Sequence, residues 1–257
     1  EALGLRAYIH LDLLRLFGPV LKEGLNQKSI PYREEFTNQL VTFMTAEEVL
    51  GKIEKDLLEA YTLLANDPIK EYGRQANKNL ENKDLAFQFR GVRMNYYAVC
   101  GTLARFYQLK GNESEALKYA KEIIDATEIF QLLKRDDIMD SRGPNLMFER
   151  ELIWALHDEK IESKMGYQLY FSYKYNIDMP SREFIYETNG YGSVEDYRRV
   201  YWWQEVKLST TFWVLGKYAR TYENNTAGST VTRKDITVWE KLLPMIRLSE
   251  MYYIAAE

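Results

Sequence analysis

Aromatic side chains are the residues of this chain with the clearest potential for ligand chemistry. The 257-residue sequence contains 20 Tyr and 5 Trp, and aromatic residues make up 14% of it. A flat ring with a polar edge suits sugar recognition, because a pyranose stacks its C–H face on the ring while its hydroxyl groups need hydrogen-bond partners. The rings crowd the second half of the chain, where the candidate ligand-binding residues are Tyr191, Tyr201, Trp202, Trp203 and Trp213.

The same rings have an alternative role, which is to pack loops against the rest of the fold. Trp202 and Trp203 are adjacent, so in an extended segment their side chains face opposite ways, and at most one is expected at a surface site. Nearby, Asp196, Arg198 and Arg199 fit a structural ion-pair network better than a binding site. The ligand-binding hypothesis therefore rests on composition and location.

Residues with catalytic or metal-binding potential are few. The sequence lacks the zincin, nucleophile-elbow, P-loop and dinucleotide-binding signatures. His10 and His157 are the only histidines, and we expect a structural role for each. Asp136, Asp137 and Asp140 lack the spacing and central glycine of a calcium loop, and adjacent aspartates do not face each other as a glycosidase pair does. We predict no enzyme activity, no metal site and no cofactor.

Composition excludes several other classes of protein. The net charge is −4 with mixed signs, so there is no basic stripe to hold a nucleic-acid backbone. Hydrophobic residues make up 46% of the sequence, but no run approaches the roughly 18 consecutive apolar residues of a membrane-spanning helix. Cys100 is the only cysteine, which excludes an internal disulfide, and its apolar setting predicts a buried thiol.

The first part of the chain has the periodicity of helices. Residues 1–17 form an apolar stripe at three- and four-residue spacing, and Pro19 prevents its continuation. Gly18 is expected to end this helix with a positive φ, and residues 20–44 read as a surface loop. Thr45 starts the helix predicted over 45–65 with a capping box. The apolar stripe of the helix predicted over 1–17 consists of Leu3, Ala7, Leu11, Leu14 and Phe17.

Residues 90–109 and 113–126 form the clearest unit, two predicted helices separated by a short turn. Ala104 and Ala116 are the small side chains that let the two helices of a tetratricopeptide-type pair approach closely. Such a pair needs neighbours stacked on it, and the helices predicted over 1–17, 45–65 and 244–257 are available. The contacts within the pair are assigned to Leu103, Tyr107, Leu117, Ala120, Ile123 and Ile124.

The amino-acid composition of residues 127–240 differs from that of the preceding helical part. Aromatic residues alternate with Gly, Asn, Ser and Pro, which predicts loops, short helices and little sheet. A short strand is expected over 151–157, and the segment 224–234 has almost no apolar content. We assign 1–126 to a helical tetratricopeptide-like part, 127–240 to a loop-rich, ligand-facing part and 241–257 to a returning scaffold helix.

Several segments together resemble the SusD/RagB family, the nutrient-binding lipoproteins of Bacteroidetes outer membranes. The opening helix is similar to a family motif, with Gly-Pro-Val in place of the commoner Gly-x-Val-Pro, and the closing segment is similar to a second family helix. Shorter similarities lie between them. The segments are Arg6-Ala7-Tyr8 with Leu11 and Leu14 to Val20, Asp196 to Arg199, Gly216-Lys217-Tyr218, and Leu243 to Glu257.

The resemblance implies an all-α, tetratricopeptide-like fold with a large loop-rich region, in one domain over residues 1–257. It also implies capture of a glycan or another nutrient at the cell surface without catalysis, and delivery to a SusC-like TonB-dependent transporter in the outer membrane. Both ends of the chain lie within helical patterns, so we expect an internal part of a longer lipoprotein whose lipid anchor lies outside it. The alternative class is a tetratricopeptide scaffold that binds peptides; a helical glycoside hydrolase ranks third.

Overall fold

The chain is organised into two compact units, which we describe separately. The helical unit comprises Glu1–Leu132, Arg150–Ala155 and Met245–Glu257, and the second unit comprises Leu133–Glu149 and Leu156–Pro244. The structure is a computed structural model. It describes residues 1–74, 88–134, 136, 139–140, 143–144, 147–161, 164, 184–186, 196, 198–199, 202–207, 211–215, 222–223, 232–233 and 241–257.

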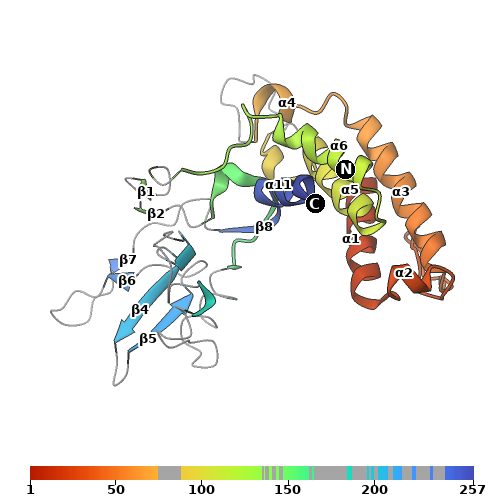
Figure 1. Ribbon diagram of the computed structural model, residues 1–257, viewed down its shortest axis with the longest axis horizontal. Coiled ribbons are helices and arrows are strands. Elements are labelled where there is room, and N and C mark those ends of the chain that lie inside the picture. Colours follow the sequence, from red (N-terminus) through yellow and green to blue (C-terminus); the bar gives the residue numbers. More distant parts are fainter. Residues whose placement is uncertain are drawn as a thin grey trace. The chain divides into compact units, whose positions relative to one another are not determined.

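Helices form most of the helical unit (Figure 1), as predicted. The strands are short and form two-stranded sheets, which pair β1 with β2, β3 with β8, β4 with β5 and β6 with β7. The helical elements are α1 (Ala2–Phe17), α2 (Leu21–Gly24), α3 (Ala46–Leu63), α4 (Ile69–Tyr72), η2 (Arg90–Val92), α5 (Tyr96–Leu109), α6 (Glu113–Ile124), η3 (Glu149–Glu151) and α11 (Leu248–Ala256). The strands are β1 (Met139–Asp140), β2 (Gly143–Pro144), β3 (Leu152–His157), β4 (Trp203–Lys207), β5 (Thr211–Leu215), β6 (Tyr222–Glu223), β7 (Thr232–Arg233) and β8 (Leu242–Arg247).

Side-chain caps determine where the longer helices start. The predicted capping box is confirmed: the amide of Glu48 donates to the Thr45 hydroxyl over 3.2 Å, and the Thr45 amide donates to the Glu48 carboxylate over 2.8 Å. The helix predicted over 90–109 begins later, at Tyr96, because the Asn95 side chain accepts a hydrogen bond from the third amide of α5. The preceding residues form the short helix η2.

The end of α1 differs from its predicted geometry. Gly18 has φ −81° and ψ 171°, an extended conformation, so the expected positive φ is wrong. Close packing explains instead why a glycine occupies this position. A Cβ atom at residue 18 would lie 2.5 Å from the Leu14 carbonyl oxygen and 3.0 Å from the Ser29 hydroxyl oxygen. Phe17 does not join the buried stripe of α1, since it is 71% exposed.

α5 and α6 form the predicted helix pair at the centre of the helical unit. Ala104 and Ala116 are both buried, as a close approach of the two helices requires, and Leu103 and Ile123 lie in the same core. Leu117 was assigned to this contact, but it is 40% exposed, because it lies on the outer face of α6. α3 also contacts α5, and α11 contacts both α5 and α6, so the pair has the neighbours that its apolar faces need.

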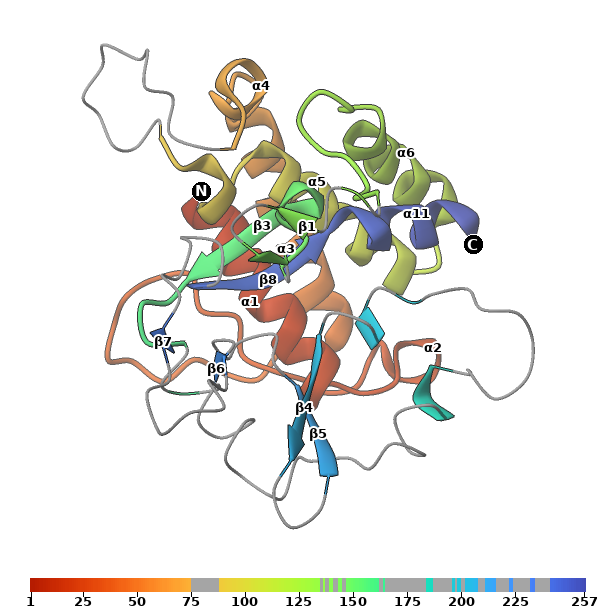
Figure 2. The same ribbon diagram turned by 90° about the vertical axis from the view of Figure 1, so that its left-hand side faces the viewer.

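The closing segment is a strand followed by a helix. The helix predicted over 241–257 starts only at Leu248, and residues 242–247 form β8 (Figure 2). Pro244 has no amide hydrogen and disfavours helical geometry in the preceding residue, which explains the extended conformation. β8 pairs with β3, the strand predicted over 151–157.

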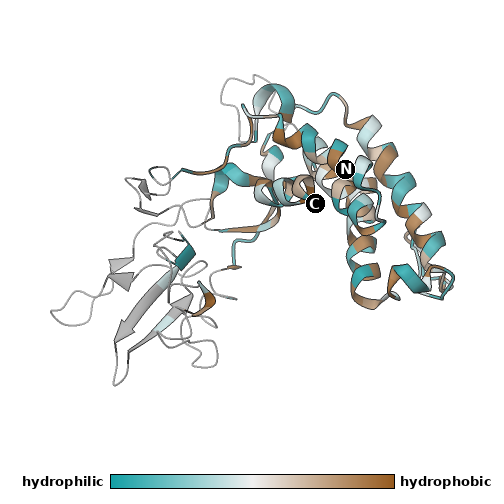
Figure 3. Cartoon of the chain, in the orientation of Figure 1, coloured by the Kyte–Doolittle hydropathy of each residue, from teal (hydrophilic) through white to brown (hydrophobic). Residues whose placement is uncertain are grey.

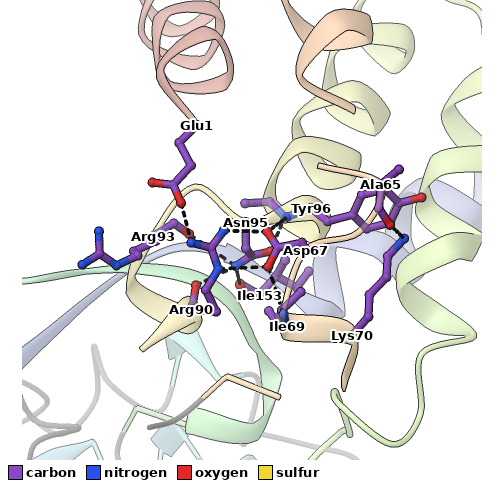
Figure 4. A network of polar contacts seen from close by, with 11 residues as sticks. Glu1, Ala65, Asp67, Ile69, Lys70, Arg90, Arg93, Asn95, Tyr96 and Ile153 are labelled. Atoms are coloured by element: carbon purple, nitrogen blue, oxygen red, sulfur yellow. Dashed lines mark hydrogen bonds and ion pairs between the residues drawn. The ribbon is translucent and has the colours of Figure 1, made fainter. Parts of the chain in front are cut away.

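A buried carboxylate joins η2, α4 and α5 (Figure 4). The two oxygens of Asp67 accept from the Arg90 guanidinium over 2.9 and 2.6 Å, from the Ile69 amide over 2.9 Å and from the Tyr96 amide over 3.0 Å. Glu1 adds a second ion pair to Arg90. Without the Asp67 side chain, the amides of Ile69 and Tyr96 and two guanidinium nitrogens of Arg90 would lose this shared acceptor, so Asp67 holds three segments in place.

Asn95 extends the same network. Its side-chain amide nitrogen lies 3.0 Å from the Arg90 carbonyl oxygen, 3.3 Å from that of Arg93 and 3.1 Å from that of Ile153. Its side-chain oxygen accepts from the Ala98 amide over 2.9 Å. The side chain therefore caps α5 and also ties η2 to β3.

A second polar network attaches the segment after α2 to α1 and α3. Asp56 of α3 accepts from Arg6 over 2.6 and 2.8 Å and from the Tyr32 hydroxyl over 2.6 Å. The Nδ1 atom of His10 lies 2.7 Å from the Arg6 carbonyl oxygen, and its Nε2 atom accepts from the Arg33 amide over 3.1 Å. His10 therefore ties α1 to the segment after α2, in the structural role that we predicted.

Candidate functional site

Two of the candidate tryptophans lie on the β4–β5 hairpin of the second unit. The strands are antiparallel, and the register places Trp203 opposite Leu215 and Glu205 opposite Trp213. Opposite residues share a face of the pair, as do alternate residues along one strand. Trp203 and Trp213 therefore lie on the same face as diagonal neighbours, at a separation of roughly 7–8 Å that is typical of such pairs. Both side chains are half-buried.

The polar edge of Trp203 has a fixed partner. Its indole N–H donates to the Tyr186 hydroxyl over 2.9 Å. The Arg198 guanidinium carbon lies 5.9 Å from the centre of the Tyr186 ring, within the range of a cation–π contact. These contacts fix the orientation of the Trp203 ring while leaving part of it accessible.

Asp196 holds Arg198 beside Tyr186. The two residues form an ion pair with nitrogen–oxygen distances of 2.6 and 3.0 Å, in agreement with the structural ion-pair reading of this segment. The hydrogen bond from Arg198 holds the pKa of the Asp196 carboxyl below its usual range, so the carboxylate stays charged at neutral pH. The guanidinium therefore serves to position an aromatic ring.

Trp202 has a different partner from that of its neighbour. Its ring lies against Phe148, with the ring centres 5.5 Å apart and the planes 30° apart. Phe148 is buried and has a φ of 52°, in the left-handed region that bulky residues rarely adopt. Trp202 and Trp203 thus have separate partners, and both side chains are half-buried.

The structure brings together only part of the predicted site. Trp203 and Trp213 share one face of the hairpin, and Trp202 packs on Phe148. Tyr191 and Tyr201 lie outside the described residues. Phe148 was not a candidate, because it is far from the tryptophans in sequence and no motif marks it.

The described residues offer little for catalysis or metal binding. Within the ranges that the structure describes, no group of three or more His, Cys, Asp and Glu side chains could hold a metal ion. Burial raises the pKa of the Cys100 thiol well above its usual range, so this cysteine is the inert core residue predicted from its apolar setting. His157 lies 3.5 Å from the Glu159 carboxylate, and Asp137 of the acidic cluster lies outside the described residues.

Comparison with known proteins identifies the fold. No protein-family model matches the sequence, and no curated protein matches it. Three solved structures from Bacteroides vulgatus do match: a SusD superfamily protein (TM-score 0.65, 20% identity), a proposed sugar-binding protein (0.64, 22%) and a SusD-like carbohydrate-binding protein (0.57, 16%). They match 100%, 99% and 99% of this chain, respectively. The chain therefore has the helical SusD-like fold.

The chain spans about half the length of these structures, since it covers 52%, 51% and 49% of them, respectively. Among the described residues, no helix has the length and apolar character needed to cross a bilayer.

Proposed function

We propose that this chain is part of a surface-exposed outer-membrane lipoprotein that binds an oligosaccharide or another nutrient without transforming it. The bound nutrient is passed to a SusC-like TonB-dependent transporter in the same membrane. The SusD-like fold supports this proposal, and so do the descriptions of two matching structures, one as a SusD-like carbohydrate-binding protein and one as a proposed sugar-binding protein. The lipid anchor and the transporter are both part of this proposal.

The observation that carries the proposal is the pair of tryptophans on one face of the β4–β5 hairpin. Trp203 and Trp213 are half-buried, and the Trp203 ring is oriented by its hydrogen bond to Tyr186. An oriented ring loses little conformational entropy on binding, and its exposed part offers a flat apolar surface for the C–H face of a sugar. Trp202 is the weaker candidate, because its ring packs on Phe148.

Affinity electrophoresis of the full-length protein tests this proposal. The protein is run in native gels that contain a panel of polysaccharides, and each polysaccharide is analysed afterwards for released products. We expect retardation by one glycan with no product release. Trp203→Ala and Trp213→Ala are expected to weaken the retardation, because each removes a stacking surface.

Tyr253→Ala is the matched control. Tyr253 is an exposed aromatic residue on α11 of the helical unit, so its loss should leave glycan retardation unchanged. Circular dichroism spectra establish that each variant is folded. Retardation that survives in folded Trp203→Ala and Trp213→Ala would contradict this site, and binding of peptides but no glycan would favour the tetratricopeptide scaffold. Product release would contradict the non-catalytic role.

The delivery step is tested separately. Affinity purification of the tagged lipoprotein from outer membranes in mild detergent should recover a TonB-dependent transporter. Recovery of the lipoprotein without any such transporter would contradict delivery and leave the sugar-binding proposal intact.

A further inference from the structure

Tyr186 has a hydroxyl proton that the described residues do not use. Its oxygen accepts a hydrogen bond from the indole N–H of Trp203 over 2.9 Å. An indole can only donate, whereas a phenol hydroxyl has one proton to donate and two lone pairs that accept. Within the part of the chain that the structure describes, no acceptor takes the Tyr186 proton. This proton is therefore left for solvent or for a bound molecule.

Two contacts hold the Tyr186 side chain in one orientation. The bond from Trp203 fixes its hydroxyl end, and the Arg198 guanidinium carbon lies 5.9 Å from its ring centre. Asp196 in turn binds two nitrogens of Arg198, over 2.6 and 3.0 Å. A donor that is already oriented loses little conformational entropy when it binds. Because hydrogen bonds in a chain polarise one another, accepting from Trp203 also makes Tyr186 a stronger donor.

The Tyr186 side chain adjoins exposed apolar groups. It is half-buried, whereas its neighbours Phe184 and Ile185 are 78% and 56% exposed. Figure 3 shows the segment 184–186 mainly in brown, the colour of hydrophobic residues. A polar donor at the border of exposed apolar side chains matches a sugar, which has apolar C–H faces and hydroxyl groups at its rim.

The bond from Trp203 sets the position of the Tyr186 oxygen relative to the indole ring. An indole N–H lies in the plane of its ring, and hydrogen bonds prefer near-linear geometry, so the oxygen lies close to that plane. A pyranose stacked on the exposed part of the Trp203 ring sits about 3.5–4.0 Å above it. An equatorial hydroxyl at the rim of this sugar extends over the Tyr186 oxygen, within reach of its proton.

We propose that Tyr186 determines specificity at this site by donating its hydroxyl proton to an equatorial hydroxyl of the sugar that stacks on Trp203. Asp196 balances the charge of Arg198, so the group recognised at this edge is a neutral hydroxyl and not a carboxylate. A sugar that lacks this hydroxyl, or carries it in the axial position, loses the bond. This inference rests on the proposed function, because it needs a sugar on the Trp203 ring.

Isothermal titration of the full-length protein with deoxygenated sugars tests this inference. The probes are oligosaccharide fragments of the polysaccharide that retards the protein in native gels, and derivatives in which a single hydroxyl is replaced by hydrogen. Wild-type protein is compared with Tyr186→Phe, which keeps the ring and removes only the hydroxyl. Tyr252→Phe is the matched control, because Tyr252 is a 42% exposed tyrosine on α11 of the helical unit.

We expect one monodeoxy derivative to bind wild-type protein roughly two- to tenfold more weakly than the unmodified fragment, which is the contribution of one hydrogen bond. Tyr186→Phe should bind this derivative and the unmodified fragment equally well, because the bond is already lost in the variant. Tyr252→Phe should discriminate between them as the wild-type protein does.

A uniform loss of affinity for every probe in Tyr186→Phe would overturn the inference, because the hydroxyl would then only hold the Trp203 ring in place. Wild-type discrimination in Tyr186→Phe would also overturn it. Both results would leave the proposed function intact. If the wild-type protein bound no sugar, the proposed function would be contradicted, and this inference with it.

Discussion

The two units use aromatic residues in opposite ways. In the helical unit, the hydroxyls of Tyr61 and Tyr96 both donate to the carboxylate of Glu122. Burial and the bond to Glu122 raise the pKa of Tyr61 to about 12, so its phenol is a fixed neutral donor. In the second unit, Trp203 donates its indole N–H to Tyr186 but remains half-buried. The first arrangement locks rings inside helix packing, and the second orients a ring at a surface.

This difference separates aromatic residues that build the fold from those available to a ligand. The abundance of tyrosine does not by itself indicate binding, because several tyrosines of the helical unit donate their hydroxyls to carboxylates of the same unit. Ring exposure together with an anchored polar edge is the more selective criterion. Perturbing the helical unit should therefore change stability, whereas perturbing the hairpin face should change ligand affinity.

The largest effect is expected from Asp67→Ala in the helical unit. The variant leaves the buried Arg90 guanidinium and the amides of Ile69 and Tyr96 without their shared acceptor. Loss of one partner of a buried ion pair costs about 3–5 kcal/mol of the free energy of unfolding. Urea unfolding followed by circular dichroism measures this change.

Asp12→Ala is the control for Asp67→Ala. Asp12 forms an exposed ion pair with Arg15, at 3.3 Å on α1, and such pairs contribute about 0–1 kcal/mol. Similar losses of stability in the two variants would mean that the buried network does not hold the helical unit together.

Gly18→Ala should have the next largest effect. The new Cβ atom would approach the Leu14 carbonyl oxygen to 2.5 Å and the Leu14 side chain to 2.7 Å, so the backbone must shift. Overpacking of this kind costs about 1–3 kcal/mol. Gly51→Ala is the matched control, because a Cβ atom at this position in α3 meets nothing within 4 Å. It should stabilise the helix by about 0.5–1 kcal/mol, and thermal unfolding should show opposite shifts for the two variants.

Asp56→Asn should have a smaller effect, on the pH dependence of the free energy of unfolding, and it tests the comparison between the two units. Burial raises the pKa of Asp56, but hydrogen bonds from Arg6 and Tyr32 outweigh it, and the pKa is lowered overall. A lowered folded-state pKa contributes stability above the unfolded value of about 4, which is lost as the pH falls through the folded value. Unfolding measured between pH 6 and pH 2 should therefore become less pH-dependent in Asp56→Asn.

Asp196→Asn provides the counterpart in the second unit. Asp196 also has a lowered pKa, but its partner Arg198 is two residues away and more than half exposed. We expect this variant to retain most of the acid sensitivity of the parent protein. If Asp56→Asn and Asp196→Asn gave the same acid profile, the buried network of the helical unit would not determine acid stability.

Local patterns predict most of the helical unit correctly. The capping box at Thr45 and the α5–α6 pair depend on residues close in sequence, so they can be read directly. The predictions fail where contacts between residues distant in sequence determine the backbone conformation. At Gly18, a Cβ atom would meet the distant Ser29 hydroxyl as well as Leu14, and β8 is extended because Pro244 disfavours helix and β3 supplies a partner strand.

The candidate site is less predictable for the same reason. The alternation of side chains along an extended segment predicts that Trp202 and Trp203 face different partners. The hairpin register, which brings Trp213 to the face of Trp203, and the contact between Trp202 and Phe148 are tertiary features. No spacing in the sequence indicates them.

Isothermal titration of the retarding glycan into the full-length protein tests the central claim most directly. Wild-type protein is compared with Trp203→Ala, Trp213→Ala and Trp154→Phe; Trp154 is only 2% exposed, in the core of the helical unit. Loss of one stacking ring should weaken binding about tenfold, or roughly 1.4 kcal/mol, in the hairpin variants. Trp154→Phe should lower the melting temperature and leave the affinity unchanged. Unchanged affinity in both folded hairpin variants, or weaker binding only in Trp154→Phe, would contradict the account.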